Sequence, residues 1–325
     1  MTVNRLLRGG LVVLAMLGAV PAVHAEDYPS KPVHMIMPFL GGGAVDLLAR
    51  VYASKLSEYW GQQVLVEDKP GAGGNLGSSL VASAPPDGYT LLVAPHGPLS
   101  YNAVLYKSMP YDPKTAFAPI SLLARSPNFL IVPKDSPLNS LDDLINLAKA
   151  QPGKVYYGSQ GNGTTPHLTG AMLGLRAGIE VVHVPYRGAP PLFTDLISGR
   201  LTFVFADSGN TLPRVRDGLI KVFAITSDKR WPALPDVKTM AELGYPNFLS
   251  AVWYALAAPA KTPPTIVGKI HEGIMRANKD PAVIARLNEL GVEVVGSTPA
   301  EMARILADET ARWSEVIRAT GVTVD

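Results

Sequence analysis

A glycine-rich turn near the start of the chain has the residue types of an anion-binding loop. It joins a strand-like apolar run (33–37) to a helix-like run (47–57). Glycine lets the backbone turn tightly and lets a ligand approach closely, and the first N–H groups of a helix have no partner within it. These groups attract an anion. The candidate contacts are Phe39, Leu40, Gly41, Gly42, Gly43 and Asp46. The alternative is a tight turn with no ligand.

A second turn repeats this arrangement in the middle of the chain. Its glycines follow a strand-like run (155–158) and precede a helix-like run (166–175). In open α/β sheets the ligand crevice lies beyond the carboxyl ends of the strands, so two such turns can face each other. The candidate contacts are Ser159, Gly163, Thr164, Thr165 and His167. The alternatives are that the threonines only cap the helix and that His167 only packs in its first turn.

The sequence contains no motif that predicts an enzyme. No Gly-x-Ser-x-Gly elbow, His-Glu-x-x-His helix or cysteine is present. The glycine turns also lack the Gly-Lys-Ser or Gly-Lys-Thr of a phosphate-binding loop, and their spacing does not fit a dinucleotide fold. We therefore expect no catalytic residues, metal or cofactor.

The elements around the turns indicate an α/β fold. Strand and helix patterns alternate from end to end, which is typical of parallel sheets covered by helices. About 300 residues follow the N-terminal segment, more than one hydrophobic core usually supports, so two lobes are expected.

Charge and hydropathy exclude several partners. The chain has 29 basic and 27 acidic residues, and the numbers become equal without Arg5 and Arg8. Nothing therefore favours nucleic acid. After the N-terminal segment no stretch has 18 consecutive apolar residues, so a membrane-embedded mature protein is not expected. We expect a monomer.

The first 25 residues have the pattern of a secretory signal peptide. Arg5 and Arg8 precede an apolar core (11–20), which Pro21 ends, and small or short residues lead to Ala25. The core is too short for a membrane span. We predict cleavage after Ala25 and release into a periplasm.

Many short segments, in order along nearly the whole mature chain, resemble one protein family. The chain is similar to the Bug, or TctC-like, periplasmic solute-binding proteins of tripartite tricarboxylate transporters. Each segment alone is a weak signal, but the ordered set is specific. The matching segments are 28–32, Pro38-Phe39 with Gly42-Gly43 and Asp46, 61–64, 70–74, 86–92, 110–113, 148–149, 152–154, His167-Leu168, 183–186 and 195–196.

This resemblance implies a two-lobe Venus-flytrap fold of the type II-like periplasmic binding class. Each lobe is expected to be a mainly parallel sheet flanked by helices, and the lobes close on a small organic anion, commonly a carboxylate. The predicted boundaries are a signal peptide at 1–25, a first lobe at 26–123 with 251–325, and a second lobe at 124–250. The predicted hinge crossovers lie near 122–126 and 248–256.

The resemblance also extends the candidate site. The two turns are expected to hold a carboxylate largely through backbone N–H groups. Asp207 ends a strand-like run (201–205) and is placed to reach the cleft, or it only caps a turn. His96 lies in a loop expected to border the cleft, where a structural use is the alternative. For Asp46 we favour a helix cap over a ligand contact.

One departure from the family pattern and one rival function stay open. Leu40-Gly41 stands where family members usually carry prolines, which makes the loop looser and more apolar. The expected partners are TctA/TctB-like membrane subunits that take up the ligand. The rival is a binding protein that reports ligand to a sensor kinase, and an exported hydrolase is a remote third possibility.

Overall fold

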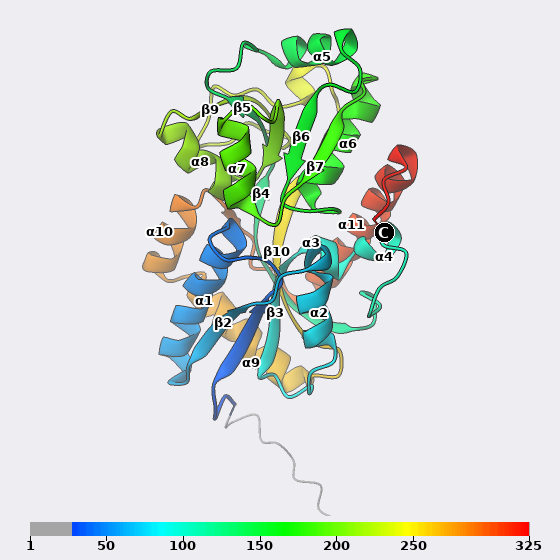
Figure 1. The fold of residues 1–325 in the computed structure, drawn as a ribbon. Helices are drawn as coiled ribbons and strands as arrows, with labels where there is room; N and C mark the ends of the chain where they lie inside the picture. Colours follow the sequence, from blue (N-terminus) through cyan, green and yellow to red (C-terminus); the bar gives the residue numbers. More distant parts are fainter. Residues whose placement is uncertain (1–27, 325) are drawn as a thin grey trace, which may run out of the picture.

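The computed structural model describes residues 28–324, which form two lobes that each contain one β-sheet (Figure 1). The predicted signal peptide and its cleavage site lie outside the described residues. The predicted two-lobe α/β fold is confirmed by the two sheets and their flanking helices.

The lower lobe in Figure 1 contains a six-stranded sheet with the strand order β11-β4-β10-β3-β1-β2. Its strands are β1 (Val33–Met37), β2 (Val64–Asp68), β3 (Thr90–Pro95), β4 (Phe117–Pro127), β10 (Ala251–Pro259) and β11 (Glu293–Val294). Its helices are α1 (Ala44–Trp60), η2 (Ala72–Gly74), α2 (Asn75–Ala82), α3 (His96–Leu99), α4 (Asn102–Leu105), α9 (Pro264–Ala277), α10 (Pro281–Glu289) and α11 (Pro299–Thr320).

The upper lobe contains a five-stranded sheet with the order β7-β6-β8-β5-β9. Its strands are β5 (Phe129–Pro133), β6 (Tyr156–Ser159), β7 (Val182–Pro185), β8 (Phe203–Ala206) and β9 (Ile220–Ile225). Its helices are α5 (Leu141–Ala150), α6 (Thr165–Ala177), α7 (Ala189–Ile197), α8 (Ser208–Arg216) and η3 (Ala241–Leu243).

The sheets are mixed, so the expectation of mainly parallel sheets is corrected. β1 pairs in parallel with β2 and β3, and β6 pairs in parallel with β7 and β8. β10 and β4 pair antiparallel with each other, β10 also pairs antiparallel with β3, and β5 pairs antiparallel with β8 and β9. Each antiparallel pair of the described strands, including β11 with β4, contains β4, β5 or β10, the strands next to the connections between the lobes.

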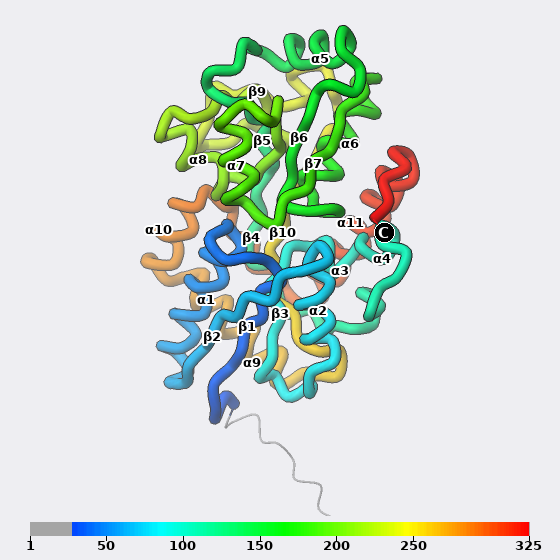
Figure 2. The backbone as a smooth tube through the Cα atoms, in the orientation of Figure 1, coloured from blue at the N-terminus to red at the C-terminus, as the bar shows by residue number. Residues whose placement is uncertain are grey.

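The two connections between the lobes, which follow β4 and precede β10, lie side by side (Figure 2), and hydrogen bonds between Asn128 and Ser250 join them. The Asn128 N–H donates to the Ser250 carbonyl at 3.2 Å, and the Asn128 side-chain amide donates to the Ser250 hydroxyl at 2.8 Å. Both residues are buried. These bonds hold the two connecting segments together. The residue ranges that the sequence predicts for the lobes and the hinge stay predictions.

The long helix α11 begins at a capping box formed by Thr298 and Glu301, as the sequence pattern predicts. It crosses from the lower lobe toward the upper one. Its Trp313 belongs to a buried cluster with Tyr101 and Leu105 of the lower lobe and Leu168 of α6. This apolar cluster therefore spans the seam between the lobes.

Candidate functional site

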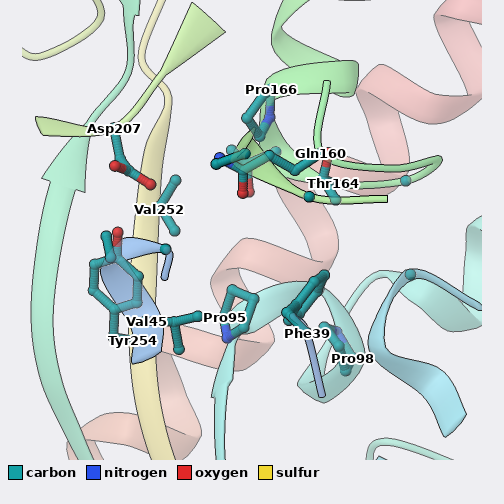
Figure 3. A pocket seen from close by; sticks show the side chains of 18 of the residues that line it. Phe39, Val45, Pro95, Pro98, Gln160, Thr164, Pro166, Asp207, Val252 and Tyr254 are labelled. Carbon is teal, nitrogen blue, oxygen red and sulfur yellow. The ribbon is translucent and has the colours of Figure 1, made fainter. Parts of the chain in front are cut away.

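A small cavity lies at the junction of the two lobes (Figure 3). Its volume is about 50 Å³, which has room for only a few water molecules. The lining residues are Phe39, Leu40, Gly43, Ala44, Val45, Gly73, Pro95, Gly97, Pro98, Tyr101, Asn102, Gln160, Gly163, Thr164, Thr165, Pro166, Gly188, Ala189, Asp207, Val252 and Tyr254. Both lobes contribute to the lining, and they touch beside it, where the Tyr101 and Thr165 hydroxyls lie 3.2 Å apart.

Three described helices of nine or more residues start at this cavity without a side-chain cap. They are α1, α6 and α7, whose N-cap residues are Gly43, Thr164 and Gly188. The first N–H groups of each helix have no partner within the helix, and they carry its partial positive charge. The lining contains no lysine, arginine or histidine among the described residues. A bound anion is therefore expected to be held by backbone N–H groups and hydroxyls.

The first glycine turn contributes Phe39, Leu40 and Gly43 to the cavity, whereas Gly41, Gly42 and Asp46 are absent from its lining. The Gly42 N–H donates to the Asp46 carboxylate at 2.9 Å, and Arg50 Nε lies 2.8 Å from its other oxygen. Asp46 therefore shapes the turn and forms an ion pair with Arg50.

The second glycine turn contributes Gly163, Thr164 and Thr165. The Thr165 hydroxyl lies 3.2 Å from the Tyr101 hydroxyl of the other lobe. Thr164 donates its hydroxyl hydrogen to the Gly161 carbonyl at 2.8 Å, within its own turn. Ser159 and His167 are absent from the lining and hydrogen-bond to the turn from behind.

Asp207 reaches the cavity and also caps α8. Its carboxylate accepts hydrogen bonds from the Asn210 backbone N–H at 2.9 Å and from the Asn210 side chain at 3.0 Å. Burial raises the pKa of Asp207 above its ordinary value. The Tyr254 hydroxyl lies on the same side of the cavity as Asp207 (Figure 3), and burial and the neighbouring Asp207 carboxylate raise the pKa of Tyr254.

His96 lies behind the cavity, which its neighbours Pro95, Gly97 and Pro98 line. Its side chain is fully buried, and its Nδ1 accepts a hydrogen bond from the Trp253 N–H at 3.2 Å. Glu309 lies 3.6 Å from Nε2. Burial nevertheless lowers the pKa of His96 to about 4, so the imidazole is neutral at neutral pH.

This buried histidine predicts loss of stability in acid. Its pKa is lower in the folded state, so between about pH 6.5 and pH 4 the unfolded state binds more protons and the free energy of unfolding falls with decreasing pH. The contribution of His96 is at most about 3 kcal/mol. His96→Asn keeps an acceptor for the Trp253 N–H but does not titrate. Urea denaturation at several pH values is expected to show a shallower pH slope for this variant, and an unchanged slope would contradict the assignment.

Sequence reasoning missed the third helix start, at Gly188 and Ala189. The signal was present, because a strand run (182–185) is followed by a glycine and then by a helix, as in the first two turns. It also missed Tyr101, Asn102 and Tyr254, which approach the cavity only through the tertiary fold.

Contacts between the lobes surround the cavity. The Tyr106 hydroxyl of the lower lobe donates to the Asn162 carbonyl of the upper lobe at 3.2 Å. A Cβ atom on Gly209 of α8 would lie 2.7 Å from Cβ of Ala44 of α1. The lobes therefore touch at Tyr106 and Asn162, and little space remains between α1 and α8.

The described residues, 28–324, lack two features that other classes of protein contain. Within them no group of three or more histidine, cysteine, aspartate or glutamate side chains is placed to hold a metal ion. None of the helices in that range is long and apolar enough to cross a membrane.

Comparison with known proteins gives consistent results. Residues 48–322 match the TctC model, described as the tripartite tricarboxylate transporter family receptor. The chain is 36% identical to an R. palustris protein solved with adipate, with a TM-score of 0.88 over 91% of this chain and 99% of that one. The periplasmic binding protein BugD is 34% identical, with a TM-score of 0.86 over 91% and 99%. MatC from Rhodopseudomonas palustris with bound malate is 30% identical, with a TM-score of 0.85 over 89% and 100%.

Proposed function

We propose that this chain, which belongs to the TctC family of tripartite tricarboxylate transporter receptors, captures a small dicarboxylate between its lobes. It then delivers the dicarboxylate to the membrane subunits of a transporter. Its family and structural neighbours are solute-binding proteins of the periplasm rather than enzymes. The observation that carries the proposal is the meeting of three uncapped helix starts, from both lobes, at one cavity.

The energetics of such a site are sufficient without a basic side chain. Four hydrogen bonds to a carboxylate at about 1.5–3 kcal/mol each give roughly 6–12 kcal/mol before ordering costs. Micromolar binding requires about 8 kcal/mol net. Pro166 of α6 and Pro190 and Pro191 of α7 have no N–H group. The first-turn N–H groups that remain still number more than four, and they belong to Ala44, Val45, Asp46, Thr165, His167 and Ala189.

The remaining lining suits a short carbon chain. Phe39, Pro95, Pro98 and Val252 present apolar surface to the cavity, which favours methylene groups. Two structural neighbours were solved with the dicarboxylates adipate and malate. These features support a dicarboxylate as the ligand.

A thermal-shift panel tests this function directly. A ligand that binds only the folded protein raises its stability by about 2.7 kcal/mol at a hundredfold excess over Kd. For a chain of this size that corresponds to roughly 5 °C. We expect such a shift with at least one of adipate, malate or succinate, and none with the matched neutral diamide. No shift with any carboxylate would contradict the proposal. Ligand uptake by cells with and without the gene tests the transport step.

Asp207 is expected to weaken the binding of a plain dicarboxylate. Its buried carboxylate borders the cavity, so Asp207→Asn removes a repulsive charge while asparagine still caps α8. We expect adipate to bind about tenfold more tightly to this variant, a gain of about 1.4 kcal/mol. Calorimetric titration at pH 7.5 measures the change.

Asp46→Asn provides the matched control for this experiment. Asp46 is also a buried helix-start aspartate, but it lies outside the cavity lining and is paired with Arg50. Adipate affinity is expected to change less than threefold in this variant. Weaker adipate binding by Asp207→Asn would instead show that the aspartate contacts the ligand favourably.

A further inference from the structure

The second glycine turn is held from behind by two histidines that the binding site itself does not use. His167 of α6 and His183 of β7 stack with ring centroids 3.7 Å apart and an angle of 12° between the rings. His167 Nδ1 accepts a hydrogen bond from the Gly163 N–H at 3.0 Å. His183 Nε2 lies 2.7 Å from the Ser159 hydroxyl.

Ser159 extends this contact into the turn. The Ser159 hydroxyl donates its hydrogen to the Gly161 carbonyl at 2.8 Å, and the Ser159 Oγ accepts a hydrogen bond from the Gly161 N–H at 3.2 Å. A hydroxyl has one hydrogen, so with that hydrogen on Gly161 the contact with His183 requires a hydrogen on His183 Nε2. The two histidines thereby fix the backbone at Gly161 and Gly163.

These two glycines have backbone angles that other residues rarely adopt. Their φ values are +141° for Gly161 and +77° for Gly163. Glycine has no side chain, so these two residues make no packing contacts of their own that would hold the turn in shape. Hydrogen bonds to their backbone groups must do so instead. The lining residues Thr164 and Thr165 follow at once, so the positions of Gly161 and Gly163 determine where the N–H groups of α6 point.

The surroundings keep both imidazoles neutral. Burial lowers the pKa of His167 to about 4, and burial together with His167 lowers that of His183 to about 3. Tyr157 of β6 packs against both rings and donates its hydroxyl hydrogen to the His167 carbonyl. Glu180 lines the adjoining surface pocket, to which the described part of the C-terminal segment contributes Ala319, Thr320 and Val322. A neutral His167 is the form that accepts the Gly163 N–H.

We propose that His167 and His183 are positioning residues that hold the ligand-binding turn of the upper lobe in its binding shape without touching the ligand. This inference rests on the proposed function, because it assigns the turn to that ligand site. It concerns groups within one lobe and is therefore testable without ligand.

The first test uses the free protein. Long-range ¹H–¹⁵N correlation spectra report the tautomer of each histidine, and we expect the hydrogen of both on Nε2 at pH 7.5. The Gly163 amide resonance is expected to move strongly in His167→Ala and to stay near its wild-type position in His167→Asn, whose side-chain oxygen replaces Nδ1 as acceptor. A hydrogen on Nδ1 of His167, or an unmoved Gly163 amide in His167→Ala, overturns the proposal whatever the ligand is.

The second test measures adipate binding by calorimetry, with melting temperatures recorded in parallel. His167→Ala is expected to lower adipate affinity at least tenfold, and His167→Asn is expected to keep it within threefold of wild type. Equal affinities of all three proteins, with only the melting temperatures differing, overturn the positioning role. Failure of wild type to bind adipate counts against the proposed function, while the spectra of the free protein still decide the role of the histidines.

Discussion

Replacing Gly163 by alanine is expected to lower ligand affinity by about 10- to 100-fold. A Cβ atom at this position would lie 2.1 Å from Cδ2 of Leu105 in the other lobe, far inside contact distance. Leu105 is 1% exposed and packed in the cluster between the lobes, so it has little room to move. Overpacking of this kind costs about 1–3 kcal/mol, and the cost falls on the closed state.

The control is Gly178→Ala, which also places alanine at a positive φ angle but causes no clash. Gly178 has a φ of +61°, compared with +77° for Gly163, but nothing lies within 4 Å of a Cβ at that position. Both variants are expected to lose similar stability from strain. Only Gly163→Ala is expected to lose affinity by calorimetry. Equal affinities would show that closure does not bring Gly163 against Leu105.

Gly209→Val tests the same closure at a second place. Gly209 has no unusual φ, yet its Cβ would lie 2.7 Å from Cβ of Ala44 across the seam. Because this clash involves two atoms next to the backbone, a rotation of a side chain does not relieve it. The variant is expected to fold normally and bind at least tenfold more weakly.

Truncating Trp313 to alanine is expected to reduce both stability and ligand affinity. The side chain is 1% exposed, its indole N–H donates to Glu309 at 3.0 Å, and its ring centroid lies 5.8 Å from that of Tyr101. Removal of a buried tryptophan costs about 3–5 kcal/mol. Its cluster contains Leu168 of the upper lobe, so part of that loss falls on the closed state and weakens binding.

Trp231→Ala is the matched control for this variant. Trp231 is 8% exposed and packs in a hydrophobic cluster whose members all belong to the upper lobe, whereas the Trp313 cluster joins both lobes. Differential scanning calorimetry is expected to show lower melting temperatures for both variants. Ligand titration is expected to show weaker binding only for Trp313→Ala, and unchanged binding there would mean that the cluster stabilises a lobe rather than closure.

The parts of the site that the sequence predicts are those that local patterns determine. A strand, a glycine turn and a helix start follow each other at Gly43 and again at Gly163, and both turns line the cavity. Asp207 also follows from its position at the end of a strand. In each case a short stretch of sequence contains the whole arrangement, because strand ends and helix starts are local features.

The parts that sequence reasoning missed depend on contacts between distant residues. Tyr101 reaches Thr165, and Gly163 approaches Leu105, from the opposite lobe and across more than 50 residues of sequence. The mixed sheets result from strands that cross between lobes, which no period in the sequence reveals. The loop of His96 borders the cavity through Pro95, Gly97 and Pro98. The His96 side chain itself is fully buried and does not line the cavity.

Small-angle X-ray scattering of the wild-type protein shows whether its lobes close on a small dicarboxylate. Scattering is recorded without ligand and with a saturating amount of whichever dicarboxylate gives the largest thermal shift. Because a ligand that contacts both lobes favours the closed form, we expect the radius of gyration to fall on saturation and the curve to approach that of the closed structure. Superimposable curves under conditions where calorimetry shows full saturation would contradict capture by closure.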